Sequence, residues 1–124
     1  MAKQLHNDVF DAALAKIATC THLNFCSSQP AAYANIAGVS LANVTLTAGD
    51  GNGDYVIADG DVSGRKITVG AQTGMVPTGN GTVTYAVLDD GTTLLAANPI
   101  TSQAITTAQV WDSPAFDIEL TDPT

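Results

Sequence analysis

Hydrophobic positions near the start of the chain recur at the spacing of one face of an α-helix. Residues 7–18 place apolar side chains three or four positions apart, which predicts an amphipathic helix. Its apolar face consists of Val9, Phe10, Ala13, Leu14 and Ile17. Asn7 is expected to cap the first turn, where Asp8 and Asp11 meet the positive end of the helix dipole. We therefore expect this helix to pack its apolar face on a sheet.

Beyond the helix, the pattern changes to the alternation of apolar and polar residues that is typical of β-strands. These segments are rich in threonine and valine and are bounded by glycine, proline, asparagine and aspartate. The predicted strands cover residues 21–26, 43–47, 55–57, 65–69, 82–88, 92–97, 103–107 and 116–120. The Asp-Asp-Gly sequence at residues 89–91 is the strongest hairpin signal in the chain.

The segments between the strands are expected to be loops. Residues 31–42 show weak periodicity and are predicted as an ordered loop, and residues 70–81 as a connection rich in glycine and proline. Residues 48–54 contain three glycines, so we expect this loop to be mobile. Asp59 and Gly60 are expected to form a turn.

The spacing of the strands indicates one fold class. We expect a mainly β protein, a compact antiparallel β-sandwich or small barrel with one N-terminal amphipathic helix packed on it. At 124 residues the chain is expected to form a single domain, residues 1–124. A domain of this size buries roughly two-thirds of its unfolded surface and can hold a core without disulfides.

Composition and charge narrow the classes of function. The hydrophobic fraction of 45% argues against disorder, and only 13% of the residues are charged. The net charge of −8 argues against binding of nucleic acid, because phosphate contacts need clustered lysine and arginine. The start of the chain lacks the apolar core of a signal peptide, and no window is long enough to cross a membrane. We therefore expect the protein to fold in a cytoplasm without a membrane partner.

An acidic loop offers the sharpest metal-binding hypothesis. Asp50, Asn52 and Asp54 follow the spacing that opens a calcium loop, and Asp59 and Asp61 lie further along. The sixth position of such a loop needs glycine and holds tyrosine, and the twelfth needs glutamate and holds Asp61. We favour a solvated acidic loop and predict no metal site, while an ion bound by residues 50–61 stays open.

Four residues resemble a row of soft-metal ligands, because Cys20, His22, Asn24 and Cys26 fall on one face of a continuous strand. Along a strand, however, Cys20 and Cys26 are ~20 Å apart, which is too far for a shared zinc ion or a disulfide. A sharp turn at the end of the helix stays open as an arrangement that brings them together. We favour two small buried hydrophobic residues, as free cysteines usually are.

No arrangement of residues indicates catalysis. His6 and His22 are the only histidines, and no serine lies in a Gly-x-Ser-x-Gly elbow. The glycines of residues 48–54 lack the lysine and the following helix of a phosphate-binding loop. A carboxylate pair stays open, but the acids at turns fit Asx turns better. We predict no enzyme activity, no catalytic residue and no cofactor.

Three further side chains are candidates for an interface. Trp111, the only tryptophan, either anchors a contact at the surface or packs in the core, and for a small β domain we favour the core. Arg65 and Lys66 form the only basic pair. They either clasp an acidic partner or, as we favour, are charges of an edge strand that discourage aggregation.

Four segments of the chain resemble a set of small structural proteins encoded among the virion genes of tailed bacteriophages. They are residues 5–14 (LHNDVFDAAL), 61–69 (DVSGRKITV), 96–103 (AANPITSQ) and 116–123 (FDIELTDP). The resemblance covers most of the chain and implies a component of the virion that is made in the host cytoplasm. It carries no catalytic residue.

The resemblance, together with size and composition, leads us to expect a decoration or cement protein that binds the outside of the phage head. The expected partner is the major capsid protein or another virion protein, and the expected assembly is a homo-oligomer, with a trimer favoured. The candidate interface consists of Lys3, Gln4, Leu5, His6, Arg65, Lys66 and Trp111. The alternatives are a tail, collar or fibre-attachment subunit, and a carbohydrate- or calcium-binding module on the virion surface.

Overall fold

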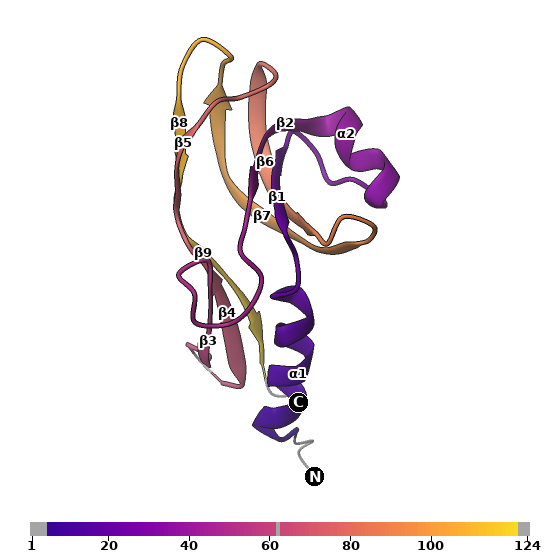
Figure 1. Cartoon of the computed structure of the whole chain (residues 1–124), viewed down its shortest axis with the longest axis vertical. Coiled ribbons are helices and arrows are strands. Elements are labelled where there is room, and N and C mark those ends of the chain that lie inside the picture. The colour runs from indigo at the N-terminus through magenta and orange to yellow at the C-terminus, as the bar shows by residue number, and fades with distance from the viewer. Residues whose placement is uncertain (1–4, 62, 122–124) are drawn as a thin grey trace.

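Two antiparallel β layers enclose a hydrophobic core, and the N-terminal helix extends the first layer along the long axis of the molecule (Figure 1). The structure is a computed structural model that describes residues 5–61 and 63–121. It confirms the predicted fold class, a mainly β, sandwich-like protein with antiparallel sheets and an N-terminal amphipathic helix.

The first layer is a four-stranded sheet with the order β2-β1-β6-β7. Its strands are β1 (His22–Cys26), β2 (Ser40–Thr45), β6 (Gly81–Asp89) and β7 (Leu94–Ile105). Every neighbouring pair is antiparallel. Leu23 and Phe25 face the core, and Asn24 between them faces outward, because successive side chains alternate across a strand.

The second layer consists of two small sheets. Two stretches of chain pass from one sheet into the other. One sheet has the order β3-β4-β9, with β3 (Tyr55–Asp59), β4 (Arg65–Val69) and β9 (Phe116–Leu120). The other pairs β5 (Gln72–Met75) with β8 (Trp111–Ser113). Only residues 70–71 separate β4 from β5, and only residues 114–115 separate β8 from β9. The layer therefore continues from one small sheet into the other.

The helix α1 (Asn7–Ile17) packs on β3 and β4 through a narrow stripe. Phe10 and Leu14 are buried and Ile17 is half-buried, at the spacing of one helical face. Val9 and Ala13 belong to the predicted face but are exposed. Each precedes a buried residue by one position and so lies about 100° around the helix from it. The buried face is therefore narrower than the sequence predicts.

The predicted cap of this helix is wrong by one residue. Asn7 is already helical, and His6, with an extended backbone, occupies the capping position. The His6 Nδ1 atom accepts a hydrogen bond from the backbone amide of Asp8 at 3.1 Å. Histidine can do this because a neutral imidazole keeps one acceptor nitrogen.

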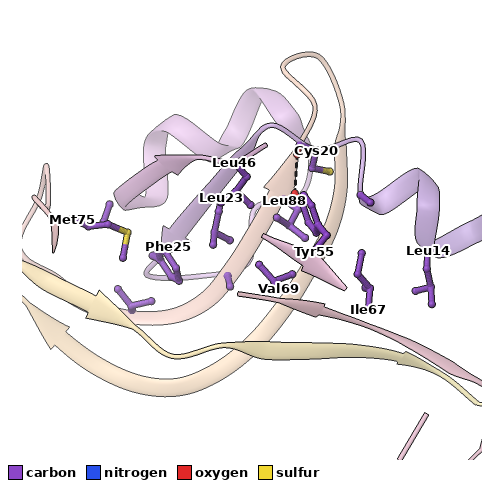
Figure 2. Close-up of a cluster of buried hydrophobic side chains, with 14 of the residues drawn as sticks. Leu14, Cys20, Leu23, Phe25, Leu46, Tyr55, Ile67, Val69, Met75 and Leu88 are labelled. Atoms are coloured by element: carbon purple, nitrogen blue, oxygen red, sulfur yellow. Dashed lines mark hydrogen bonds between the residues drawn. The ribbon is translucent and has the colours of Figure 1, made fainter. Parts of the chain in front are cut away.

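A cluster of buried side chains joins both layers and the helix (Figure 2). Leu23, Phe25 and Leu88 enter it from the first sheet, and Tyr55 enters it from β3. The Tyr55 hydroxyl donates a hydrogen bond to the carbonyl oxygen of Cys20 at 2.8 Å, which satisfies the polar end of a fully buried ring. This bond ties the turn after α1 to the second layer.

Two predicted loops contain regular structure. Residues 31–42 hold a single 3-10 turn, η1 (Tyr33–Asn35), the short helix α2 (Ile36–Val39) and the start of β2. Residues 70–81 hold β5, and a second unpredicted strand is its partner β8. These elements are too short for a period to appear in the sequence, so tertiary contacts decide them.

The predicted strands at residues 92–97 and 103–107 are one continuous strand, β7. Pro99 breaks the alternation in the sequence, yet it lies within the strand opposite Tyr85. The structure tolerates it because β7 is an edge strand, where a missing amide need not pair with a neighbour. A register shift of β6 accompanies this position, between Val83 and Tyr85.

Hydrogen bonds hold the glycine-rich loop at residues 48–54. Asp50 Oδ1 accepts the backbone amide of Ile57 at 2.9 Å, and Asp54 Oδ2 accepts that of Thr47 at 2.7 Å. The amide of Asn52 bonds further backbone groups of the loop. All three glycines have positive φ. The left-handed backbone at these positions is a reason for glycine there, and the predicted mobility of the loop stays a prediction.

Candidate functional site

A cavity of about 460 Å³ opens on the outer face of the first sheet. Strands β1, β2 and β6 form its floor, and the η1–α2 segment, which projects beside β2 in Figure 1, forms its wall. The side chains that decide its chemistry are His22, Asn24, Asn43 and Asp89 on the floor and Tyr33 and Ile36 on the wall. We refer to it as the outer-face cavity, and its volume lies within the roughly 300–1,000 Å³ of small-molecule sites.

Strand register assembles the polar floor. The antiparallel pairing of β1 with β6 places His22 opposite Asp89, and that of β1 with β2 places Asn24 opposite Asn43. Residues directly opposite each other have Cβ atoms ~4.5–5.5 Å apart. Four polar side chains from three strands therefore form one continuous strip beneath the cavity.

Asp89 is the buried centre of this strip and is only 4% exposed. Its Oδ2 atom accepts a hydrogen bond from Asn24 Nδ2 at 2.6 Å, and its Oδ1 atom accepts the backbone amide of Gly91 at 2.9 Å. His22 Nδ1 lies 3.4 Å from Asp89 Oδ1 and 3.0 Å from Thr21 Oγ1. A buried carboxylate needs such donors, because its charge has lost the solvation of water.

A second, smaller hydrophobic cluster holds the wall of the cavity in place. Ile36 of α2 packs with Cys26 and Val87, which face outward from β1 and β6. Tyr33 lies one turn earlier and remains 42% exposed. The wall is thus fixed to the sheet at one side, and its aromatic ring stays accessible at the other.

Among the described residues that line the cavity, Ser40 and His22 are too far apart to act as nucleophile and base. Ser40 lies opposite Cys26, four positions along β1 from His22. Four strand positions span about 13 Å, which is too far for a bond between hydroxyl and imidazole. The Ser40 hydroxyl instead donates to the carbonyl oxygen of Ala42 at 3.3 Å.

No group of three or more histidine, cysteine, aspartate or glutamate side chains is placed to hold a metal ion within residues 5–61 and 63–121. The acidic residues whose spacing resembles a calcium loop make other contacts. Asp50 and Asp54 accept backbone amides, as described above. Asp59 and Asp61 pair with the two basic side chains of β4.

Arg65 and Lys66 lie on β4, the central strand of its sheet, so the prediction of edge-strand charges is wrong. Arg65 faces α1, where its Nε donates to Asp11 Oδ1 at 2.7 Å and its Nη1 donates to Asp59 Oδ1 at 2.8 Å. These two carboxylates raise the pKa of Arg65. The residue therefore fastens the helix to the sheet and is already paired within the chain.

Lys66 points to the opposite face of the same sheet. Its Nζ donates to Asp61 Oδ1 at 2.7 Å and to Asp117 Oδ2 at 3.4 Å, and these bonds raise its pKa. The Asp117 carboxylate also accepts a hydrogen bond from the hydroxyl of Thr68. Neither member of the basic pair is thus an unpaired cation that waits for an acidic partner.

Trp111 packs against the main core and is partly buried, which is closer to the favoured alternative than to a surface anchor. Its ring meets Phe25 edge to face, with centroids 4.6 Å apart and an angle of 89° between the planes. The indole nitrogen donates to Gln103 Oε1 at 2.6 Å. The side chain is half-buried and partnered at both ends, so it does not stand out as a surface anchor.

The remaining candidate interface residues lie at the N-terminus. Lys3 and Gln4 fall outside the residues that the structure describes. Leu5 and His6 are exposed just before α1, and Val9 in the first turn is exposed beside them. Leu5 and His6 of the predicted interface are thus accessible, whereas Arg65, Lys66 and Trp111 already have partners within the fold.

The two cysteines are free and buried on opposite faces of the first sheet. Cys20 belongs to the main core and Cys26 to the cluster beneath α2. The chain turns after the helix and β1 begins at His22, so Cys20 is not part of the strand. The prediction of two buried hydrophobic residues is confirmed. Burial raises the pKa of Cys20 to about 12, with the nearby Asp90 and Asp89 adding to it, and raises that of Cys26 to about 11.

These thiols predict a loss of stability at alkaline pH. An ordinary thiol has a pKa of 9.0, so below that value both folded and unfolded chains keep the proton. Above it the unfolded chain ionises first, which favours unfolding progressively as the pH rises toward the folded values. We expect chemical denaturation to show a free energy of unfolding that falls from pH 9 upward.

The matched control is the double variant C20A/C26A, whose free energy of unfolding should lose the part of the slope that thiol ionisation causes. Ellman's reagent provides a second measurement. Both thiols should resist it in the folded protein at neutral pH and react rapidly in denaturant. Rapid reaction of the folded protein, or an equal slope in the double variant, contradicts the assignment.

Comparisons of this chain with protein-family models, curated proteins and solved structures found no match. No helix in the described ranges is both long and apolar enough to cross a membrane.

The sequence does not predict the outer-face cavity. Alternation correctly places His22 and Asn24 on one face, but it groups them with Cys20, which lies in the main core, and with Cys26, which shares their face but packs beneath Ile36. In the sequence, Asp89 belongs to the Asp-Asp-Gly signal of a hairpin and is interpreted as a turn residue. Only the pairing of β1 with β6 brings Asp89 to His22, and no local pattern encodes that pairing.

Proposed function

We propose that the chain is a non-enzymatic structural subunit of a tailed-phage virion that binds the major capsid protein on the outside of the head. The resemblance of four segments to small virion proteins supports this proposal. The low charged fraction of 13% supports it as well, because the central parts of protein interfaces are poor in charged residues.

Exposed apolar side chains at the two ends of the molecule carry the proposal. Six large hydrophobic side chains are exposed in the described ranges, and four of them lie at these ends. Leu5 and Val9 flank the start of α1, while Val76 follows β5 and Val110 precedes β8 at the opposite end (Figure 1). A subunit that bridges two neighbours needs such adhesive groups at both ends.

Binding of this kind reinforces a shell by mass action. A subunit that binds the assembled shell but not its separated parts adds its binding free energy to the stability of the shell. A homo-oligomer, with a trimer favoured, repeats the contact on a symmetric lattice, so each single contact can be weak.

Copy number tests the location. We expect quantitative mass spectrometry of purified virions to find at least about one copy per three subunits of the major capsid protein, as a symmetric surface lattice requires. Fewer than about one copy in twenty points to a tail, collar or fibre-attachment subunit, because those sites have low rotational symmetry. Absence from the particles refutes a virion role altogether.

Paired variants test the contact. Replacing Leu5 and Val9 by serine removes apolar surface that is exposed in the free protein, so we expect unchanged melting but at least about tenfold weaker binding to virions that lack the protein. The matched control is Val56→Ser on β3, which is 45% exposed and belongs to neither pair of end residues. Equal affinity of the double variant and the control argues against this surface as the contact.

A further inference from the structure

The geometry points to the outer-face cavity as a binding site for a neutral, hydroxyl-rich ligand of one or two sugar rings. The site goes beyond the proposed structural function and does not depend on it. The inference follows from the hydrogen-bonding groups of the floor, the apolar wall and the absence of unpaired charge among the described lining residues.

The floor presents hydrogen-bond acceptors in fixed orientations. A carboxylate can only accept, so the 2.6 Å bond to Asp89 fixes the amide nitrogen of Asn24 and turns its Oδ1 atom elsewhere. Among the described residues no group bonds Oδ1, and because none of their fully buried side-chain oxygens lacks a partner, this atom is accessible at the cavity that Asn24 lines. A ligand hydroxyl is a group that would satisfy it.

His22 supplies a second hydrogen-bonding group. Its Nδ1 atom lies 3.0 Å from Thr21 Oγ1 and 3.4 Å from Asp89 Oδ1. Its Nε2 atom has no partner among the described residues, and the side chain is 46% exposed at the cavity, so Nε2 can accept from or donate to a ligand hydroxyl. Asn43, opposite Asn24, adds an exposed amide that can donate and accept. Such a floor matches vicinal hydroxyl groups, which both donate and accept.

The wall supplies the apolar half of the site. Tyr33 is 42% exposed and Ile36 anchors the segment to the sheet. The C–H face of a sugar ring packs on an aromatic ring while the hydroxyls around the edge of the sugar reach polar groups beside it. A cavity with an apolar wall across from a polar floor therefore fits a saccharide better than a purely apolar or purely polar ligand.

Charge excludes the other small ligands. No lysine or arginine is among the described residues that line the cavity, and Asp89 repels anions, so phosphates and sugar acids are disfavoured. Calcium needs about six to eight oxygen ligands, whereas the floor has a single carboxylate whose two oxygens already accept hydrogen bonds. The charge of the cavity therefore favours a neutral ligand over an anion or a calcium ion.

Protein NMR titration of the ¹⁵N-labelled full chain tests the proposal. The probes are D-glucose, D-galactose, N-acetylglucosamine and maltose, with glucuronate as the anionic probe and calcium chloride as the cationic probe. We expect at least one neutral sugar to shift the amides of β1, η1 and α2 with saturation below about 50 mM, since such open sites bind weakly. Glucuronate and calcium should not saturate there.

Surface variants keep the test independent of folding. Asn43→Ala and Tyr33→Ala are both exposed changes and should each weaken sugar binding by about fivefold, the effect of one lost hydrogen bond or ring contact. The matched control is Asn98→Ala on β7, at the other edge of the same sheet, which should bind like the original chain.

Three results overturn the proposal: no saturation by any of the four sugars, tighter binding of glucuronate or calcium at the same amides, or full affinity in the N43A/Y33A double variant. None of them bears on copy number in virions or on the Leu5 and Val9 contact. Failure here and failure of the structural function are therefore separate outcomes.

Discussion

Replacing Phe25 by alanine is expected to lower the free energy of unfolding by about 3–5 kcal/mol, the range for a fully buried aromatic side chain. Phe25 is 1% exposed and points from β1 into the main core. It also meets Trp111 of β8 edge to face, so the truncation removes a contact that joins the first layer to the second. The loss is a large part of the stability of an ordinary domain, which is about 5–15 kcal/mol.

Urea denaturation measures this effect, with circular dichroism as the probe because the substitution alters the surroundings of the only tryptophan. The matched control is Tyr33→Ala, the same kind of truncation at a position that is 42% exposed. The control should change the free energy of unfolding by at most about 0.5 kcal/mol. A loss below about 1 kcal/mol for Phe25→Ala contradicts the packing described here.

Replacing Gly64 by alanine is expected to destabilise the protein by at least about 2 kcal/mol, for two reasons that add. Gly64 has φ +68°, a left-handed conformation that disfavours a Cβ atom. A Cβ atom built there also collides with the backbone carbonyl oxygen of Leu120 at the end of β9. Because the obstacle is backbone, relief requires β9 to move away from the turn between β3 and β4.

Two other glycines separate these causes. Gly91 has φ +96° but nothing within 4 Å of its Cβ position, so Gly91→Ala should cost only the backbone strain, about 1 kcal/mol. Gly38 lies in α2 with open space and no positive φ, so Gly38→Ala should stabilise by about 0.5–1 kcal/mol. Equal effects at Gly64 and Gly91 contradict the close approach of β9.

Elements with a long, regular period are visible in the sequence. The helix at its predicted place and the strands β1, β4 and β9 follow from the spacing of apolar side chains, since the burial of one face imposes that spacing. The short strands β5 and β8 have no period to read, and they exist because each pairs with the other. Pro99 interrupts the alternation within β7, so the sequence predicts two strands instead of one. The proline fits within a single strand only because β7 lies at the edge of its sheet.

The role of individual side chains is less predictable than the elements that carry them. Arg65 and Lys66 read as surface charges, yet both are held by carboxylates from distant parts of the chain. Trp111 packs against the core, as expected for a large apolar ring in a small domain. The difference is that an apolar side chain needs only burial, whereas a charged one needs a particular partner.

The order of residues alone fixes the fold class, the position of the helix, most strands and the absence of an obvious nucleophile motif, because each depends on neighbours within about ten positions. The pairing of β1 with both β2 and β6 decides which polar side chains line the outer-face cavity. It brings His22, Asn24, Asn43 and Asp89 together beneath one cavity. Strand register is set by the burial of the apolar faces of whole strands. The polar side chains that meet on the opposite face therefore follow from the register, which only the tertiary structure shows.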